Sequence, residues 1–282
     1  MAKKDFSFDD INAELATMNP LGSVMEFSTF SEVTEWIDSG NYHLNACISG
    51  SLFGGWPNSR ACSIAGPSGT GKTYLILNSV KCAIEMGYYV VFYDSEAAVD
   101  KDLMVKFGID VSKVNYQPVN TVQDFRTSVT TITSKMQDAK AAGGKVPKMM
   151  IILDSAGNLA TQKEIDDAKS GSDKADMTRS KVLKSIFRII MTPMADLKIP
   201  FLFTNHTYQT QDFISRQVAG GGTGPEYAAS IVLYLGKAQL KDSSGEKSGI
   251  IVTAKPNKNR FAKPHNIKFH LDFSKGMNRY VG

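Results

Sequence analysis

The chain of 282 residues is 42% hydrophobic and 21% charged, and its formal net charge is +4. These totals are ordinary for a globular protein with a sizeable core. No apolar run approaches the roughly 18 residues of a membrane span, and no apolar signal core follows the first lysines. We therefore expect neither a membrane protein nor a secreted one, but a cytoplasmic protein.

Charge and cysteines narrow the range of partners. Residues 236–282 carry ten Lys or Arg and three Asp or Glu, so this end is basic while the rest of the chain is slightly acidic. A basic end suits a polyanionic partner, although many solvated faces are also basic. Cys47, Cys62 and Cys82 show no paired spacing and no neighbouring His cluster, so we expect reduced thiols that fill apolar space.

The first predicted element is a short amphipathic helix over residues 8–18, which ends at Asn19-Pro20-Leu21-Gly22. Its apolar face must pack on something. Two interpretations stay open: the helix covers its own domain, or it docks on a neighbouring subunit. We divide the chain into an N-terminal helix and subunit-docking segment, residues 1–35, and a core, residues 36–282.

From residue 60 the patterns of strands and helices alternate. Apolar and β-branched runs predict strands over 62–65, 88–93, 149–153 and 201–204, and helical periodicity predicts helices over 72–86, 122–136 and 178–198. The periodicity over 122–136 places Ile132 on the apolar face. After Gly224, strands over 231–235, 250–253 and 267–271 follow without helices. This order predicts an α/β fold: a mostly parallel central sheet flanked by helices, with an antiparallel C-terminal extension.

The most specific local motif begins where the first of these strands ends. It matches G-x-x-x-x-G-K-[ST] without a mismatch and consists of Gly66, Pro67, Ser68, Gly69, Thr70, Gly71, Lys72 and Thr73. Glycines let backbone N–H groups converge on phosphate oxygens, and the helix that follows adds partial positive charge at its N-terminus. We expect Lys72 to reach the β- and γ-phosphates of ATP, and the Thr73 hydroxyl to bind Mg²⁺.

Two acidic residues complete the expected catalytic site. Asp154 ends the apolar strand MMIIL, where a metal-binding aspartate of a P-loop protein is expected. Glu96 follows the strand YYVVFY, the next one after the P-loop helix, so we expect that strand to lie close by in the sheet. A carboxylate at its carboxyl end would face the ligand crevice and could orient the attacking water.

These pieces together resemble the RecA family, and within it the UvsX recombinases of phages. The resemblance covers residues 40–260 and rests on the P-loop, the Asp-x-Glu element and blocks at 154–160, 176–179, 187–189, 205–208 and 220–225. It implies a RecA-like P-loop ATPase core, with ATP and Mg²⁺ bound between subunits of a helical filament on single-stranded DNA. It also implies homologous pairing and strand exchange with duplex DNA.

The resemblance assigns roles by position. Glu96 corresponds to the catalytic glutamate, and His206 to the residue that senses the γ-phosphate. Asp100 matches an adenine-contacting aspartate, and Leu103 stands where the family has an aromatic ring that stacks on adenine. Lys255, and less clearly Lys258, fall near lysines that reach the ATP of the adjacent subunit, although Pro256 and the spacing depart from the family's pattern. The sequence leaves open that these lysines are only surface charges and that His206 is an ordinary strand-end histidine.

The resemblance also predicts two DNA-binding loops, about 157–177 and 207–224. The helix after the first loop carries Arg179, Lys181, Lys184 and Arg188, and the last three share one helical face that can contact phosphates. The second loop offers Phe213 as a wedge between bases and Arg216 for phosphate, followed by Gly220, Gly221 and Gly222. A merely solvated basic face is the alternative for the helix.

The sequence therefore predicts a DNA-dependent ATPase that acts as a recombinase in replication and repair. Expected partners are single-stranded DNA, homologous duplex DNA, further copies of the chain, and recombination mediator and single-strand-binding proteins, in a bacterial host's cytoplasm if a phage encodes the chain. Alternatives are a hexameric helicase motor on the same core, and a nucleotide-binding mediator without strand exchange. A small-molecule kinase fits least, since no substrate-lid pattern appears.

Overall fold

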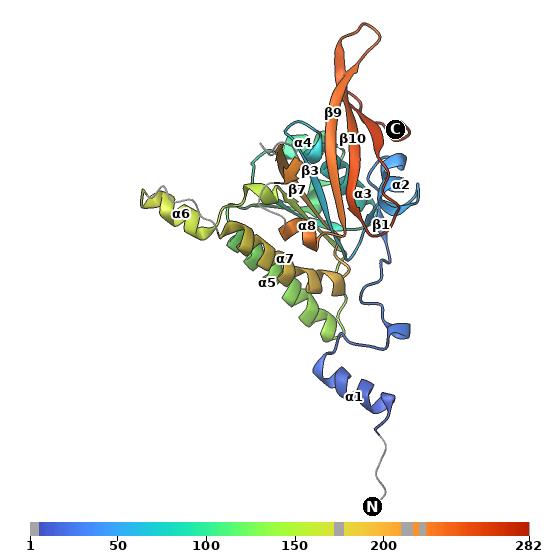
Figure 1. The fold of residues 1–282 in the computed structure, drawn as a ribbon, viewed down its shortest axis with the longest axis vertical. Coiled ribbons are helices and arrows are strands. Elements are labelled where there is room, and N and C mark those ends of the chain that lie inside the picture. Colours follow the sequence, from blue (N-terminus) through green and yellow to red (C-terminus); the bar gives the residue numbers. More distant parts are fainter. Residues whose placement is uncertain (1–5, 172–177, 210–216, 220–223, 282) are drawn as a thin grey trace, which may run out of the picture.

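The computed structural model describes residues 6–171, 178–209, 217–219 and 224–281. A sheet of ten strands forms its centre, with helices on both faces (Figure 1). Within the described residues, no helix is both long enough and apolar enough to span a membrane.

The elements of the first half of the chain are α1 (Phe8–Met18), η1 (Met25–Phe27), β1 (Trp36–Ile37), α2 (Tyr42–Ser49), β2 (Trp56–Pro57), β3 (Ala61–Gly66), α3 (Lys72–Glu85), β4 (Tyr89–Asp94), α4 (Lys101–Lys106), η2 (Val111–Lys113), β5 (Val114–Pro118) and α5 (Val122–Ala141). Those of the second half are β6 (Met149–Asp154), η3 (Ala156–Asn158), α6 (Gln162–Lys169), α7 (Arg179–Asp196), β7 (Phe201–Gln209), β8 (Gln217–Ala219), α8 (Gly224–Ala228), β9 (Ile231–Lys241), β10 (Lys247–Asn259), β11 (Ile267–Asp272) and β12 (Gly276–Met277).

The main sheet has the strand order β12-β11-β10-β9-β3-β7-β6-β4-β5, and β8 pairs with β7. Strands β5, β4, β6, β7, β3 and β9 are mutually parallel, and β10, β11 and β12 continue the sheet in antiparallel pairs. The predicted α/β class with an antiparallel C-terminal extension is confirmed. The antiparallel part begins at β10, because β9 runs parallel to β3.

Two other strands separate the pair that the sequence analysis expected to lie close together in the sheet. The strand after the P-loop helix, β4, does not lie next to β3, because β7 and β6 are inserted between them. Parallel strands are joined by long crossover connections, so consecutive strands in the chain need not be adjacent in the sheet. The local sequence therefore does not determine the strand order. Glu96 must therefore reach the P-loop across the ends of two strands.

Two apolar clusters, one on each face of the sheet, form the core. One contains Leu75 and Val80 of α3, and the other joins Phe125 of α5 and Phe187 of α7 to the sheet. Ile132, expected on the apolar face of α5, is 36% exposed, whereas Thr133 is 1% exposed and its hydroxyl donates to Val129 O over 2.8 Å. In a helix a threonine hydroxyl can donate to the backbone carbonyl four residues earlier, so Thr133 can be buried without an unpaired polar group. A pattern of apolar residues alone therefore assigned Ile132 to the wrong face of α5.

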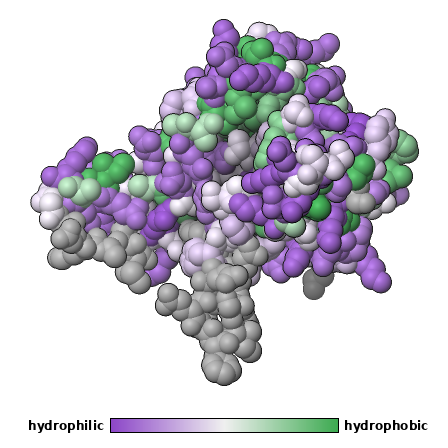
Figure 2. All heavy atoms as spheres, turned by 90° about the horizontal axis from the view of Figure 1, so that it is seen from above, coloured by the Kyte–Doolittle hydropathy of each residue, from purple (hydrophilic) through white to green (hydrophobic). Residues whose placement is uncertain are grey.

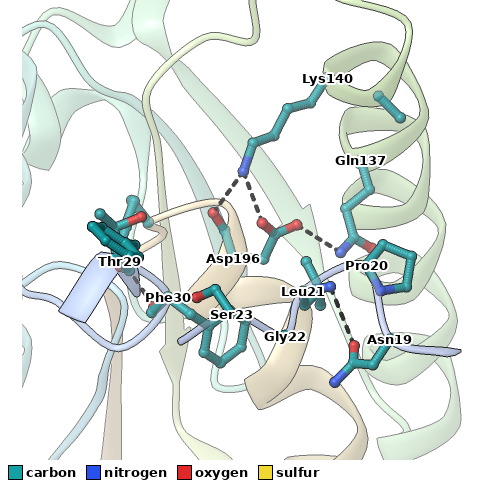
Figure 3. A pocket seen from close by; sticks show the side chains of 13 residues that line it. Asn19, Pro20, Leu21, Gly22, Ser23, Thr29, Phe30, Gln137, Lys140 and Asp196 are labelled. Atoms are coloured by element: carbon teal, nitrogen blue, oxygen red, sulfur yellow. Dashed lines mark hydrogen bonds and ion pairs between the residues drawn. The ribbon is translucent and has the colours of Figure 1, made fainter. Parts of the chain in front are cut away.

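The N-terminal segment extends from the body, and α1 contains no buried residue (Figure 1). In this structure the helix does not cover its own domain, and docking on a neighbouring subunit stays a prediction. The linker after it is held by Lys198, whose ammonium donates to the carbonyls of Thr29, Phe30 and Glu32. A cleft of about 690 Å³ lies between this linker and the C-terminal ends of α5 and α7, where Asp196 accepts from Lys140 and Gln137 (Figure 3).

The two segments predicted to be loops contain regular structure. Helix α6 lies within 157–177, and it is nucleated by a capping box in which Glu164 N donates to Thr161 Oγ1 and Thr161 N to Glu164 Oε2. The sequence Thr-Gln-Lys-Glu carries this signature and could have predicted the helix. Within 207–224, β7 continues to Gln209 and pairs with β8.

The three cysteines are free thiols, as expected. Burial raises the pKa of the Cys47 thiol to about 11 and that of Cys82 to about 12, and it raises the pKa of Cys62 still further. Thiols with raised pKa values are poor nucleophiles and poor metal ligands at neutral pH.

Candidate nucleotide-binding site

The P-loop connects β3 to α3 in a conformation that only glycine takes readily. Gly69 and Gly71 have φ angles of +70° and +88°. A Cβ on Gly71 would lie 2.4 Å from Cδ1 of Leu271, so a side chain there would also have to displace the end of this leucine. The Thr70 hydroxyl closes the turn by donating to Pro67 O over 2.9 Å. The motif thus has the curved backbone that a phosphate cradle requires.

Lys72 lies inside this curve. Its ammonium donates to Gly66 O over 2.9 Å and to Pro67 O over 3.1 Å, and the residue is 7% exposed. Burial lowers the pKa of the Lys72 ammonium, although the carboxylates of Asp154 and Glu96 oppose this effect. A cation held in a dry site interacts strongly with an arriving anion, because the local dielectric constant is low.

Asp154 occupies the carboxyl end of β6 and is 2% exposed. Its Oδ2 accepts from the Thr73 hydroxyl over 2.8 Å, and its Oδ1 accepts from the Thr204 hydroxyl of β7. Burial raises the pKa of the Asp154 carboxyl, and the two hydroxyl donors counteract this. Thr204 was not predicted as part of the site; its parallel alignment with the end of β6 brings it there.

This donor set fits Mg²⁺. One carboxylate and one hydroxyl stand together at the P-loop, and the described part of the chain contains no group of three or more His, Cys, Asp or Glu arranged to hold a metal ion. Mg²⁺ keeps several waters and binds through one or two carboxylates together with substrate phosphates, whereas zinc sites use three or four protein ligands. Thr73 and Asp154 are therefore suited to hold it.

Glu96, His206 and Lys72 form one chain of contacts. His206 Nε2 lies 2.8 Å from Glu96 Oε1, and His206 Nδ1 lies 3.4 Å from Lys72 Nζ. An imidazole that donates from Nε2 to the carboxylate and accepts at Nδ1 from the ammonium satisfies both contacts, since Lys72 can only donate. The structure thus brings together three residues that the sequence analysis assigned separately.

The turn that carries Glu96 is held by a residue whose role was not predicted. Asp94, at the end of β4, accepts through Oδ1 from the backbone N–H groups of Glu96 and Ala97, each over 2.8 Å. Ser95 N donates to Asp154 O over 2.8 Å and so carries the chain across the end of β6. In the Asp-x-Glu element, Asp94 therefore orients the backbone that carries Glu96. The turn after β4 brings Glu96 past the end of β6, toward β7 and the P-loop.

The residues proposed to contact adenine have structural roles as well. Asp100 caps the N-terminus of α4, where its Oδ1 accepts from Leu103 N over 2.7 Å. Leu103 is partly buried against the core cluster of α3. Neither observation tests a contact with adenine, which stays a prediction.

The two lysines expected to act across a subunit boundary differ. Both lie on β10, where Lys255 is exposed and pairs in register with Tyr234. The Lys258 ammonium donates to the carbonyls of Tyr227 over 2.9 Å and Glu226 over 3.2 Å, so it holds the C-terminal end of α8 within its own chain. Burial and the charge of Arg260 lower the pKa of Lys258, against the opposing charge of Glu226.

Helix α7 presents the predicted basic face. Lys181, Lys184 and Arg188 are exposed. Arg179 is different: its guanidinium donates to the backbone carbonyls of Leu159, over 2.8 Å, and Gly157. In this structure Arg179 therefore organises the chain that follows β6, rather than presenting its charge beside the other three.

The described ends of both predicted DNA loops lie at the nucleotide site and at α7. The first segment starts three residues after Asp154, the last residue of β6, and the second starts directly after His206 on β7. Gly224, at the end of the second, is pressed against α7, where an added Cβ would lie 2.7 Å from Cβ of Lys184. Phe213, Arg216, Gly220, Gly221 and Gly222 fall outside the described residues.

Comparison with known proteins places the chain in a family. The sequence profile of the RecA N-terminal domain matches residues 10–278. The chain is 35% identical to the recombination and repair protein of Enterobacteria phage T4 over 85% of its own length, and it spans 60% of that protein. It is 26% identical to Protein RecA of Bacteroides thetaiotaomicron over 96% of its length, covering 81% of that protein. The resemblance inferred from the sequence is thereby confirmed: the chain belongs to the RecA family.

Proposed function

We propose that this protein is an ATP-dependent recombinase that assembles on single-stranded DNA and pairs it with homologous duplex. The observation that carries the proposal is the chain of contacts from Lys72 through His206 to Glu96. It joins the phosphate cradle to β7, and β7 runs directly into the predicted DNA loop. Membership of the RecA family and the T4 relative, itself named a recombination and repair protein, support the same assignment.

The chemistry assigned to the site is hydrolysis of ATP. Lys72 would exchange its bonds to the carbonyls of Gly66 and Pro67 for the β- and γ-phosphates, and Thr73 and Asp154 would hold Mg²⁺. When bound, the metal neutralises charge on the phosphates. Glu96 would orient the attacking water and accept its proton.

Nucleotide state would reach DNA through His206. A γ-phosphate near Lys72 would compete with His206 Nδ1 for the hydrogen bond from the Lys72 ammonium. Strand β7, which carries His206, and the segment after it would therefore respond to hydrolysis. By linkage, DNA that favours the ATP-bound arrangement must raise the affinity for ATP. A higher turnover with DNA would follow if that arrangement is also the one that hydrolyses ATP. ATP thus acts as a conformational switch, and strand exchange itself breaks no covalent bond of DNA.

Assembly would complete the site. The exposed apolar side chains of α1 suit docking on a neighbouring subunit: Phe8 is 66% exposed, Leu15 55% and Met18 71%. Lys255, or Lys258 after release from α8, would then reach the neighbour's ATP and make hydrolysis depend on assembly. We place this filament in the cytoplasm of a bacterial host, with mediator and single-strand-binding proteins as further partners.

Two features would bind DNA: a basic helical face and the second predicted loop. Lys181, Lys184 and Arg188 would bind phosphates, and the segment of residues 207–224 would contact bases. Figure 2 looks down on the end of the molecule that carries the β9–β10 hairpin and shows hydrophilic side chains beside apolar patches. The basic residues of 236–282 would attract a second polyanion, such as the incoming duplex.

The test measures ATPase rate with and without single-stranded DNA in the wild type, Lys72→Ala and Lys81→Ala. We expect DNA to raise the wild-type rate several-fold, Lys72→Ala to be inactive with or without DNA, and Lys81→Ala, farther along α3, to behave as the wild type. Electron microscopy with an ATP analogue should show helical filaments on DNA. A wild-type rate that DNA leaves unchanged, together with absence of filaments, would contradict the proposal.

A further inference from the structure

Strand β9 directs a second lysine at the phosphate loop. Side chains alternate along a strand, and Leu233 and Leu235 point into the core cluster that contains α3. Lys237 is the next residue on that face, one step beyond the core, and β9 is the neighbour of β3, from which the P-loop begins. The Lys237 ammonium donates to Ser68 O over 2.9 Å.

This hydrogen bond fixes a peptide plane. A trans peptide is planar, so its C=O and N–H groups point in opposite directions. Because Lys237 holds the carbonyl of Ser68, the N–H of Gly69 in the same peptide must point away from β9. The ammonium also packs over Gly69 itself: an added Cβ would lie 2.8 Å from Lys237 Nζ. Gly69 has φ of +70° and no side chain, so its own side-chain packing does nothing to fix the orientation of this peptide.

The positive charge of Lys237 acts on Lys72 inside the nucleotide site. The pKa of Lys72 is lowered mainly by its own burial, and the positive charge of Lys237 lowers it further, against the carboxylates of Asp154 and Glu96. The cleft that contains Lys237 and Gly69, about 540 Å³, is lined also by Phe273 and by Lys247, whose ammonium lies 5.4 Å from the Phe273 ring centroid. This side of the P-loop therefore presents two cations and an aromatic ring.

We propose that Lys237 is a positioning residue for nucleotide binding: it holds the Ser68–Gly69 peptide so that the Gly69 N–H faces the phosphates. The inference rests on the proposed nucleotide site and deepens it. The signal is invisible in the P-loop motif, because the residue that sets the loop lies about 170 positions away on β9. The ligand class is a nucleoside di- or triphosphate, since the peptide belongs to the cradle itself.

The experiment compares Lys237→Met, which keeps the aliphatic stem, with Lys237→Gln, which keeps an N–H donor. The matched control is Lys241→Met, on the same face of β9 but about 13 Å further along. Titration of fluorescent ADP and ATP analogues gives the affinities, and thermal denaturation and kcat at saturating ATP are measured beside them. We expect about five-fold weaker binding of both nucleotides in Lys237→Met, partial recovery in Lys237→Gln, and wild-type affinity in Lys241→Met.

In the absence of DNA, the melting temperature and the kcat at saturating ATP should stay at their wild-type values in all three variants. The inference is overturned if Lys237→Met binds nucleotide as the wild type does. It is also overturned if the Met and Gln variants lose affinity equally and high salt abolishes the difference, since that indicates charge alone, or if the melting temperature falls in parallel. A wild type that binds neither analogue would instead contradict the proposed nucleotide site.

Discussion

The nucleotide site and the basic face of α7 are built on opposite principles. In the first, Lys72 and Asp154 are 7% and 2% exposed, and hydrogen bonds join side chains from strands β6 and β7, the turn after β4 and the P-loop. In the second, Lys181, Lys184 and Arg188 stand exposed at spacings of three and four along one helix. Like charges at these spacings destabilise a helix by about 0.2–0.5 kcal/mol per pair.

The difference teaches what each region requires of its ligand. The buried site has its groups placed in advance, so substitutions there should be strongly coupled, because each group has another as its partner. The α7 face has charge but little mutual bonding, so substitutions there should be nearly additive and sensitive to salt. The predictions that follow test this contrast, from the largest effect to the smallest.

The largest effect should come from Glu96→Gln. Removing the base is expected to lower kcat by about 10²- to 10⁴-fold while leaving nucleotide affinity nearly unchanged. Because His206 contacts Glu96 directly, adding His206→Gln should lower kcat little further. Steady-state ATPase assays of both variants measure this, with Glu85→Gln at the exposed end of α3 as the control. Losses that simply multiply would show that the two residues act independently.

A smaller effect is expected at α7. Changing Lys181, Lys184 and Arg188 to Gln one at a time should weaken single-stranded DNA binding by similar factors, and the triple variant should show the product of the three. Each change should reduce the slope of log K against log salt by about 0.7, because one phosphate contact is lost. Fluorescence anisotropy at several salt concentrations measures this, with Lys135→Gln on α5 as the control. An unchanged slope in the triple variant would show that the face does not contact DNA.

The same contrast explains what the sequence could predict. The P-loop, Asp154 and the parallel strands were predictable because each is set by neighbours in the chain: glycines, β-branched runs and strand ends. The strand order, the contact of His206 with Glu96 and the bonds from Thr204 and Lys237 could not be predicted, because they depend on which strands lie side by side. Arg179 is a case where a residue was predicted but its contacts were not: the sequence placed it beside the basic face, and the structure shows its bonds to Gly157 and Leu159 instead.

The smallest effect separates two buried aspartates that share a register position on neighbouring strands, Asp94 on β4 and Asp154 on β6. Asp154 receives two hydroxyl donors, which can also accept, so an amide can replace the carboxylate without losing a bond. Asp94 receives two backbone N–H groups at Oδ1, and the Tyr116 hydroxyl and Val99 N–H at Oδ2. An amide nitrogen there would face the N–H of Val99 and leave a donor unsatisfied.

We therefore expect Asp154→Asn to stabilise the nucleotide-free protein at neutral pH by on the order of 1 kcal/mol, and Asp94→Asn to destabilise it by about 1–3 kcal/mol. Burial raises the pKa of Asp154 in the folded state above 3.8. In the pH window between 3.8 and that raised pKa, the folded protein keeps a proton that the unfolded chain has lost. This group's contribution to stability thus falls as pH rises through the window, and the advantage of Asp154→Asn should grow with it and vanish below pH 3.8. Urea denaturation in EDTA across this pH range measures the difference. An Asn variant that gains nothing at neutral pH would show that the two hydroxyl donors and the nearby Lys72 ammonium together offset the cost of burying the charge.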